Sequence, residues 1–280
     1  MIRSVLHEGC TFAFRDQGTG EPLVFIQGVG LHGDGWKPQF DDLSHKYRTL
    51  SFDNRGMASS QPLGRPLTVE VMARDTLTIM DAADVASAHL VGHSLGGCIA
   101  QQIALISPQR VRSLSLLCTS ARGADATDLS WKMLWLGIRT RMGTRRMRRL
   151  AFMQMVISPE FLATHDHDQT ARDLAPIFGH DLAETPPVVM KQLAALKRFD
   201  STARLRELGT IPTLVLSAAH DIIFPPSFGR GLAEAIGGSH FVEVPAAAHG
   251  VTIENAGLIN RTLDDHIQKG TKFREPGLGT

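Results

Sequence analysis

The sequence predicts an α/β fold in which a mostly parallel central sheet is flanked by helices and interrupted by a helical insertion. In the first 121 residues, and again from residue 201, short apolar runs alternate with segments of helical periodicity, which is the rhythm of a parallel sheet covered by helices. Residues 122–200 instead keep a helical pattern throughout. We therefore expect a core formed by 1–121 and 201–268, a helical cap over 122–200, and a disordered tail over 269–280.

The expected strands are short apolar or alternating runs, which lie in chain order at 11–15, 23–26, 47–52, 87–91, 112–118, 213–217 and 240–244. The run 23–26 is continuously apolar and ends at glycines, as expected of a buried strand that leads into a functional loop. Helices are expected where apolar residues recur at helical spacing, over 68–83, 95–107, 227–236 and 251–267. Thr68 is the expected N-cap of the first helix, because its hydroxyl can accept a free backbone N–H.

Composition excludes several classes of protein. The chain has 280 residues, of which 43% are hydrophobic and 20% charged, so neither a disordered nor a low-complexity chain fits. A net charge of +1 is too small to attract the whole protein to nucleic acid or to a membrane surface. No apolar run approaches the roughly 18 residues of a membrane span. The N-terminus lacks the apolar region of a secretory signal, so we expect a cytoplasmic protein.

Three cysteines, Cys10, Cys98 and Cys118, are too few for a disulfide scaffold, and they are expected to be buried and reduced. The chain has neither the CxxC nor the HExxH spacing of common metal sites. No metal and no organic cofactor are therefore expected.

The sharpest motif is Gly92-His93-Ser94-Leu95-Gly96, which follows a predicted strand and opens a predicted helix. A serine on such a strained turn needs small neighbours, and the two glycines let the backbone approach closely. The start of the helix adds free N–H groups and a partial positive charge, and both favour a developing oxyanion. Ser94 is the candidate nucleophile, although the glycines alone would also suit a tight turn between strand and helix.

Serine is a poor nucleophile by itself, so a base and a group that orients the base are required. His249 is the candidate base, because it follows strand 240–244 in a loop of small residues at the carboxyl edge of the sheet. Asp221 follows strand 213–217 and is the candidate that holds the imidazole in one tautomer. Asp125 is a weaker alternative for this role.

The loop after strand 23–26 offers a second set of backbone donors. It reads QGVG, and the residues around Gly28 are flexible enough to aim an N–H at the serine. We expect the amides of Val29 and Leu95 to hold the oxyanion.

Together these motifs resemble the α/β-hydrolase superfamily, in the branch of capped esterases, enol-lactonases and C–C hydrolases. The chain order Ser94, Asp221, His249 is the order of that family, and the resemblance covers nearly the whole chain. The family's first loop often reads His-Gly-x-Gly, so Gln27 departs from it at the histidine. This departure keeps the backbone amide but changes a supporting hydrogen bond.

A second stretch supports the resemblance. The run DNRGMASS, which begins at Asp53, is similar to the family's Asp-x-Arg-Gly-x-Gly-x-Ser turn, with Ala58 in place of the second glycine. In the family the Asp and Arg brace loops near the nucleophile. The resemblance therefore implies structural roles for Asp53 and Arg55.

The insertion is expected to roof the site and to select the substrate. Trp131 and Trp135 lie four residues apart on one helix face, where with the cap methionines they could form an adaptable apolar wall. Packing inside the cap is an equally good interpretation for each of them. Gly28 and Phe224 complete the expected substrate pocket.

The insertion also carries a basic run. Six arginines lie within 139–149, and no acidic residue stands between Asp128 and Glu160. A solvated basic face is the preferred interpretation, because charge runs usually face water. Binding of an anionic substrate or partner is the alternative.

The leading prediction is a serine hydrolase that cleaves a small, largely hydrophobic carboxylic ester or lactone through an acyl-enzyme on Ser94, with water as co-substrate. Two alternatives remain open, namely C–C bond hydrolysis of a keto acid or β-diketone and a slow-turnover ligand receptor of the same fold. In relatives of this fold, cofactor-free haloperoxidase or perhydrolase activity is a side reaction of the same triad, and the sequence leaves it open. Epoxide hydrolases and haloalkane dehalogenases are disfavoured because their nucleophile is an aspartate. The sequence does not predict the oligomeric state.

Overall fold

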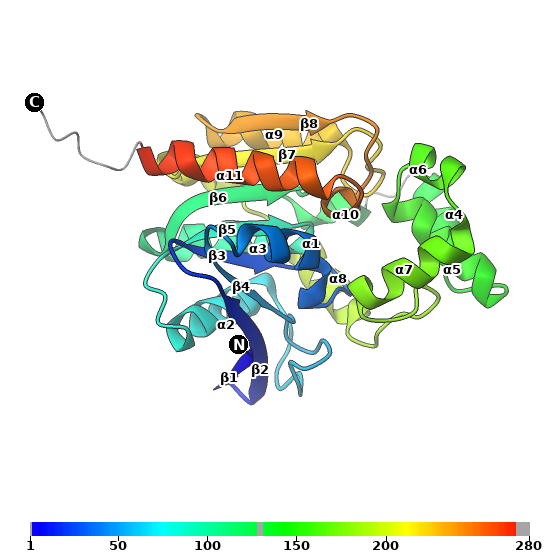
Figure 1. The fold of residues 1–280 in the computed structure, drawn as a ribbon, viewed down its shortest axis with the longest axis horizontal. Coiled ribbons are helices and arrows are strands. Elements are labelled where there is room, and N and C mark those ends of the chain that lie inside the picture. The colour runs from blue at the N-terminus through cyan, green and yellow to red at the C-terminus, as the bar shows by residue number, and fades with distance from the viewer. Residues whose placement is uncertain (1, 128–130, 273–280) are drawn as a thin grey trace, which may run out of the picture.

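The computed structural model describes residues 2–127 and 131–272. Within them, eight strands form one sheet in the order β1-β2-β4-β3-β5-β6-β7-β8, with helices on both faces (Figure 1). The strands are β1 (Ile2–His7), β2 (Cys10–Gln17), β3 (Pro22–Ile26), β4 (Arg48–Phe52), β5 (Ala88–His93), β6 (Val111–Leu117), β7 (Thr213–Ala218) and β8 (His240–Val244). β2 pairs antiparallel with β1 and β4, and all other neighbours pair in parallel, so the predicted, mostly parallel sheet is confirmed.

The helices around the sheet are α1 (Lys37–Leu43), α2 (Val69–Ala82), α3 (Leu95–Ile106), α8 (Val189–Arg198), α9 (Pro226–Ile236), α10 (Val251–Glu254) and α11 (Ala256–Lys272). Side chains of β3 alternate between two apolar clusters: Val24 and Ile26 enter one, Leu23 and Phe25 the other. Because successive strand residues point to opposite faces, the clusters lie on the two faces of the sheet. Helices α2, α3 and α9 pack in the first cluster, and α1 and α11 in the second.

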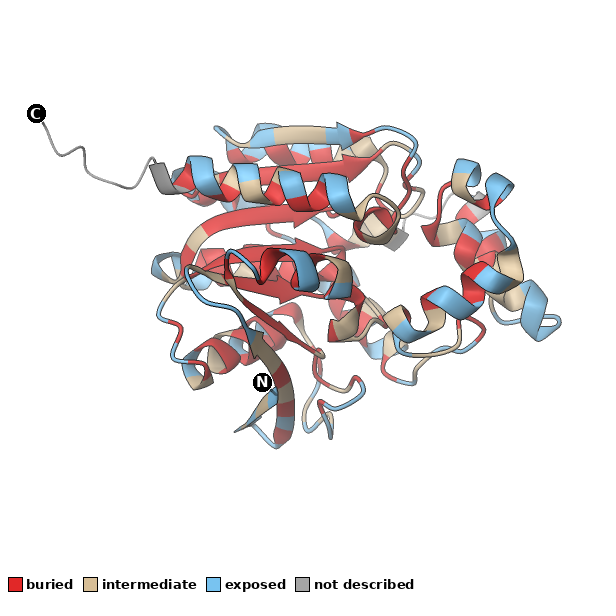
Figure 2. Ribbon diagram, viewed as in Figure 1, coloured by how far each residue is buried: buried red, intermediate tan, exposed pale blue. Residues whose placement is uncertain are grey.

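The central strands are buried on both faces. Every residue of β5 and β7 is buried, which explains why both strands contain no Asp, Glu, Lys or Arg (Figure 2). Thr68 caps α2 as predicted, because its hydroxyl accepts the N–H of Val71 at 3.1 Å. No helix among residues 2–127 and 131–272 combines the length and apolar character needed to cross a membrane.

Three expectations differ from the structure. Strand β1 was not expected because none of its residues is buried, so its pattern carries little signal. Helix α1 was missed because it is short and buries only three residues, one of them Gln39. The last helix breaks at Asn255 and then continues to Lys272, so 269–272 is helical rather than disordered. Residues 273–280 of the predicted tail lie outside the described residues.

Four further helices, which we call the cap helices, lie together beyond the carboxyl ends of the strands (Figure 1). They are α4 (Trp131–Arg139), α5 (Arg145–Val156), α6 (Pro159–Thr164) and α7 (His167–Phe178). The cap helices contribute to an apolar cluster of their own, which includes Met153, Leu174 and Phe178. Helix α8 packs instead with the first cluster of the sheet through Ala195 and Leu196.

Candidate active site

Ser94 lies at the junction of β5 and α3 with φ 55° and ψ −121°, a backbone conformation that residues other than glycine rarely adopt. The junction is tight enough to require the flanking glycines. A Cβ on Gly92 would lie 2.2 Å from the carbonyl oxygen of Gly96, and a Cβ on Gly96 would lie 2.0 Å from that of Ile26. The Ser94 N–H donates to the Leu117 carbonyl at 2.9 Å, which ties the turn to the end of β6.

His249 and Asp221 come from different loops and meet at the carboxyl edge of the sheet. His249 Nδ1 lies 2.7 Å from Asp221 Oδ2, and both side chains are buried. The other carboxylate oxygen accepts the amides of Ile223 at 2.8 Å and Phe224 at 2.9 Å. The Asp221 carboxylate is therefore held in place before it orients the imidazole.

Asp125, the weaker candidate for the orienting role, faces another partner. Its carboxylate lies 3.8 Å from the guanidinium of Arg122, which directly precedes the short 3-10 segment Gly123–Thr127. The structure thus brings His249 together with Asp221.

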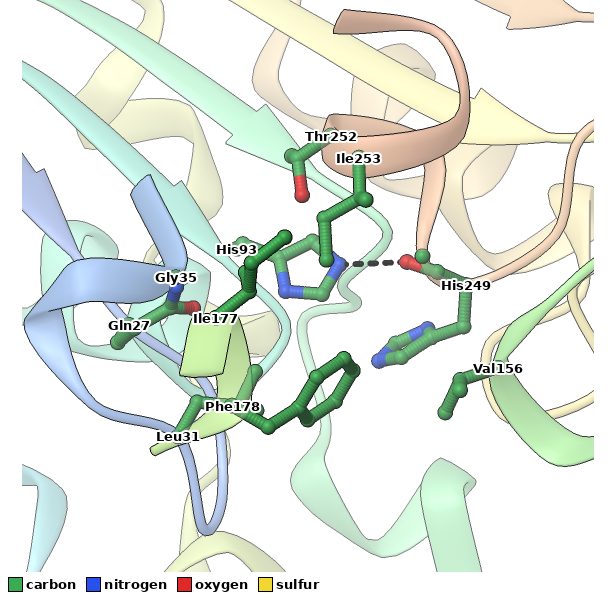
Figure 3. A pocket seen from close by; sticks show the side chains of 11 residues that line it. Gln27, Leu31, Gly35, His93, Val156, Ile177, Phe178, His249, Thr252 and Ile253 are labelled. Atoms are coloured by element: carbon green, nitrogen blue, oxygen red, sulfur yellow. Dashed lines mark hydrogen bonds between the residues drawn. The ribbon is translucent and has the colours of Figure 1, made fainter. Parts of the chain in front are cut away.

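His93 is a functional neighbour that sequence reasoning missed. Its Nε2 lies 2.8 Å from the carbonyl oxygen of His249, and Figure 3 shows this contact as a dashed line. Because a carbonyl oxygen can only accept, Nε2 of His93 carries the proton. Burial lowers the pKa of His93 to about 3, so the ring stays neutral. Its place immediately before Ser94 was the available signal, since it joins the serine turn to the loop of His249.

The loop after β3 lies against the serine, because a Cβ on Gly28 would approach the Ser94 Cβ to 3.2 Å. The Gly28 amide donates to Gln27 Oε1 at 3.0 Å, and the Gly30 amide donates to Gln192 Oε1 at 2.8 Å. Val29 lies between them, and in the part of the chain that the structure describes its amide has no protein acceptor.

The second expected donor is the amide of Leu95, the first residue of α3. An amide at this position has no acceptor within its own helix. The side chain of Gln27, which stands where the family often has histidine, accepts the amide of Gly28 instead. Its backbone carbonyl accepts Asn54 Nδ2 at 2.8 Å, which fixes the loop to the turn after β4.

A family model described as the alpha/beta hydrolase fold matches residues 21–256, a span that includes Ser94, Asp221 and His249. The chain belongs to the alpha/beta hydrolase fold family. The resemblance drawn from the sequence motifs and the predicted fold class are both confirmed.

Known relatives of this α/β hydrolase match most of its length. The "Putative non-heme bromoperoxidase BpoC" of Mycobacterium tuberculosis is 28% identical over 257 residues, which cover 90% of this chain and 95% of the relative. The "Putative carbamate hydrolase RutD" of Klebsiella pneumoniae is 30% identical over 255 residues, covering 89% and 92%. The solved structure of a thermophilic esterase from Thermogutta terrifontis has a TM-score of 0.77 at 25% identity, covering 96% of this chain and 97% of that one. These names differ in substrate, so the family leaves the substrate open.

The α/β-hydrolase site borders a pocket formed by both core and cap helices. His93, His249 and Ile253 line it from the core, while Val156 and Phe178 reach it from α5 and α7 (Figure 3). Sequence reasoning assigned neither of these cap residues to the pocket. Their apolar character suits a hydrophobic part of a substrate.

Of the four residues predicted for the substrate pocket, two lie near the candidate site and two lie on the cap away from it. Gly28 lies beside Ser94, and the Phe224 ring is buried with its centroid 6.2 Å from that of His249. Trp131 is 86% exposed, and it lines neither described pocket. Trp135 is 54% exposed and lines a second cavity of about 710 Å³ between cap helices, with Leu136, Ile157 and Leu162.

Three arginines in the second half of the basic run, Arg145, Arg146 and Arg149, form ion pairs with acidic residues. Arg145 lies 2.8 Å from Asp181, and Arg149 Nε donates to the same carboxylate at 2.9 Å. Arg146 lies 3.0 Å from Asp168 at the start of α7. These ion pairs link α5 to α7 and to the segment that follows it.

The predicted brace of the loops also has a physical basis. The buried Arg55 donates from Nε to Asp75 at 2.8 Å, and Asp53 accepts the amide of Gly33 at 2.8 Å. Both contacts join the turn after β4 to other segments of the core.

Three buried side chains near the site could offer metal ligands, since atoms of His93, Cys118 and His249 lie within 4.8 Å of one another. One ring nitrogen of each histidine has a protein partner, because His249 Nδ1 bonds Asp221 and His93 Nε2 bonds a carbonyl. Burial, with the neighbouring Asp221 carboxylate, raises the pKa of the Cys118 thiol, so the thiolate that a metal needs is disfavoured. The cluster fits the histidine–aspartate pair better than a metal centre.

Proposed function

We propose that the protein is a serine hydrolase that cleaves a small, largely hydrophobic carboxylic ester or lactone through an acyl-enzyme on Ser94. The observation that carries the proposal is the 2.7 Å contact of His249 Nδ1 with Asp221. Ser94 follows on a strained turn directly after His93, whose ring bonds the His249 carbonyl. The Nδ1 proton is donated to a carboxylate, so Nε2 keeps the lone pair that a general base needs. Family membership implies a small-molecule substrate and water.

The proposed reaction has two halves. In the first, Ser94 Oγ attacks the carbonyl carbon while His249 Nε2 takes its proton, and Asp221 stabilises the imidazolium. The C–O bond then breaks, and His249 returns the proton to the leaving alcohol. In the second half, water gives a proton to His249 and attacks the acyl carbon. The bond from that carbon to Ser94 Oγ then breaks, His249 returns the proton to Oγ, and the acid leaves.

Charge on the carbonyl oxygen develops in both halves of the reaction. The amides of Val29 and Leu95 are its proposed donors, because they belong to two segments that flank Ser94. Amides that point at the oxyanion before the reaction begins need no rearrangement in the transition state. Neither side chain takes part, so substitutions there act through backbone geometry.

Ester or lactone cleavage is favoured over C–C hydrolysis because apolar side chains line the pocket beside His249, and because three of the six cap arginines already pair with acidic residues. A keto-acid substrate would need a cation for its carboxylate, and the basic run was the candidate source. Arg145, Arg146 and Arg149 are engaged by acidic residues of the cap region. Apolar side chains such as Val156 and Phe178 line the pocket beside His249, which suits a hydrophobic substrate.

The test compares turnover of p-nitrophenyl acetate and p-nitrophenyl octanoate by the wild-type protein and by Ser94→Ala. We expect the wild type to hydrolyse at least one ester, and Ser94→Ala to lose about 10³-fold or more in kcat. The ratio of turnover for the two esters shows whether the pocket accepts a short or a long acyl chain. Negligible turnover by a wild type that a small ester nevertheless stabilises would favour the receptor alternative.

A further inference from the structure

The cap helices are joined to the loop of His249 by partly buried hydrogen bonds, most of which converge on one acidic residue. We infer that Glu254 is a positioning residue, which fixes His249 by fastening its loop to the cap at Ser158. This role rests on the proposed function, because it takes His249 to be the base for Ser94.

The Glu254 carboxylate bridges two segments that are far apart in the sequence. Its Oε2 accepts the N–H of Ser158 at 2.9 Å and the hydroxyl of Ser158 at 2.5 Å. Its Oε1 accepts the amide of Ala248 at 3.4 Å. Ser158 begins cap helix α6, and Ala248 immediately precedes His249. One carboxylate therefore joins the cap to the residue before the candidate base.

A second bond holds the residue that follows His249. The Gly250 amide donates to the carbonyl of Val156, the last residue of cap helix α5, at 2.5 Å. A Cβ on Gly250 would lie 2.7 Å from that oxygen, so the close approach requires glycine at this position. Both neighbours of His249 are thus tied, one to Glu254 and the other directly to the cap.

The surroundings of Glu254 favour strong hydrogen bonds to its carboxylate. Ser158 is 1% exposed, and burial raises the pKa of Glu254, while the bonds from Ser158 and Ala248 oppose that rise. A carboxylate taken out of water is costly unless donors surround it, and charge-assisted hydrogen bonds are roughly twice as strong as neutral ones. The Ser158 hydroxyl also accepts the Phe161 amide at 3.3 Å, so it both caps α6 and donates to Glu254.

A third contact between cap and core offers a matched control. Glu160 Oε2 lies 3.0 Å from Nδ1 of His220, the residue before Asp221, and both side chains are exposed. Exposed ion pairs contribute little, since water screens them. Glu160 therefore shares the charge and the general location of Glu254 but lacks its buried partners.

The variant Glu254→Gln keeps the side-chain shape but replaces one acceptor oxygen with an amide donor. It can then no longer accept from both Ser158 and Ala248. A misplacement of about 1 Å at a catalytic group costs on the order of 100-fold in rate. We expect kcat for a p-nitrophenyl ester to fall about 10- to 100-fold with KM within about threefold. Ser158→Ala removes only the hydroxyl bond and should fall less, and Glu160→Gln should match the wild type.

The measurement pairs kinetics with amide hydrogen exchange at Ser158, Ala248 and Gly250. We expect exchange at these amides to accelerate in Glu254→Gln and Ser158→Ala, together with slower labelling of Ser94 by a small fluorophosphonate. Wild-type exchange and labelling in both variants would overturn this inference and leave the proposed function intact. A wild type that is not labelled at Ser94 would contradict the proposed function itself, and the positioning role with it. If Glu254→Gln does not fold, Ser158→Ala alone decides.

Discussion

Asp221 and His249 form the best-defined contact of the candidate site, with 2.7 Å between Oδ2 and Nδ1. The carboxylate is fixed from behind by the backbone amides of Ile223 and Phe224, at 2.8 and 2.9 Å. It therefore has little freedom to rotate, and the imidazole that it bonds is held in one orientation. This rigid support is what a general base needs in order to meet a serine hydroxyl repeatedly in the same geometry.

Replacing Asp221 tests this support. Asp221→Asn keeps the size of the side chain but removes the charge that fixes the tautomer and stabilises the imidazolium. We expect kcat for a p-nitrophenyl ester to fall by about 10³- to 10⁴-fold with a small change in KM. Asp125→Asn is the control, because Asp125 faces Arg122, and it should retain nearly full turnover. Similar losses in both variants would contradict the assignment.

The turn that carries Ser94 should not tolerate a methyl group at Gly92. The added Cβ would lie 2.2 Å from the Gly96 carbonyl oxygen, so the backbone must shift. We expect Gly92→Ala to lower the free energy of unfolding by about 2 kcal/mol or more in a urea titration. Gly231→Ala, at an open position of α9, should stabilise the protein by up to about 1 kcal/mol. A neutral Gly92→Ala would show that the turn is looser than described.

The ion pairs of the cap lead to a prediction about substrate charge. The double variant Arg145→Ala and Arg146→Ala breaks contacts to Asp181 and Asp168, which hold cap helices together. We expect KM to change by the same factor for an anionic ester and for its neutral analogue. A rise in KM confined to the anionic ester would instead support an anion-binding role for these arginines.

Buried histidines should make stability depend on pH. Burial lowers the pKa of His89 to about 4, of His93 to about 3 and of His266 to about 4. Between the unfolded value, about 6.5, and these folded values, the unfolded state binds protons that the folded state does not. Burial of the neutral imidazoles therefore does not lower the free energy of unfolding above about pH 6.5. As the pH falls toward 4, protons bind the unfolded state and the free energy of unfolding decreases.

This pH dependence can be measured by urea unfolding between pH 7 and 4.5. Each such histidine contributes a slope of up to about 1.4 kcal/mol per pH unit. His89→Gln should reduce the slope, because it removes one of the buried imidazoles. An identical slope in the wild type and in His89→Gln would contradict the prediction for His89.

Local patterns in the sequence predicted the parallel sheet, and they singled out Asp221 and His249, which are in contact in the structure, because each pattern depends on a short stretch of chain. The glycines around Ser94 predict its tight turn, and His249 and Asp221 each follow an apolar strand. Contacts between distant segments could not be predicted in this way. The bond from His93 to the His249 carbonyl arises only when the end of β5 meets the loop of His249. The Glu254 bridge to Ser158 arises only when α10 meets the cap.

The cap was the least predictable part for a physical reason. Apolar residues at helical spacing indicate a helix, but they do not say which neighbour covers its apolar face. Trp131 was a candidate for the substrate pocket, yet it is 86% exposed, whereas Val156 and Phe178 line the pocket beside His249. The basic run likewise revealed its ion pairs only once α5 lay near Asp181.

The most direct test of the central claim is intact-mass spectrometry after exposure of the protein to a small fluorophosphonate, with Ser94→Ala treated in parallel. An activated serine attacks the phosphorus and retains one phosphonyl group. The account predicts a single adduct on the wild type that maps to Ser94 and is absent from Ser94→Ala. An unmodified wild type, or an adduct that persists in Ser94→Ala, would contradict it.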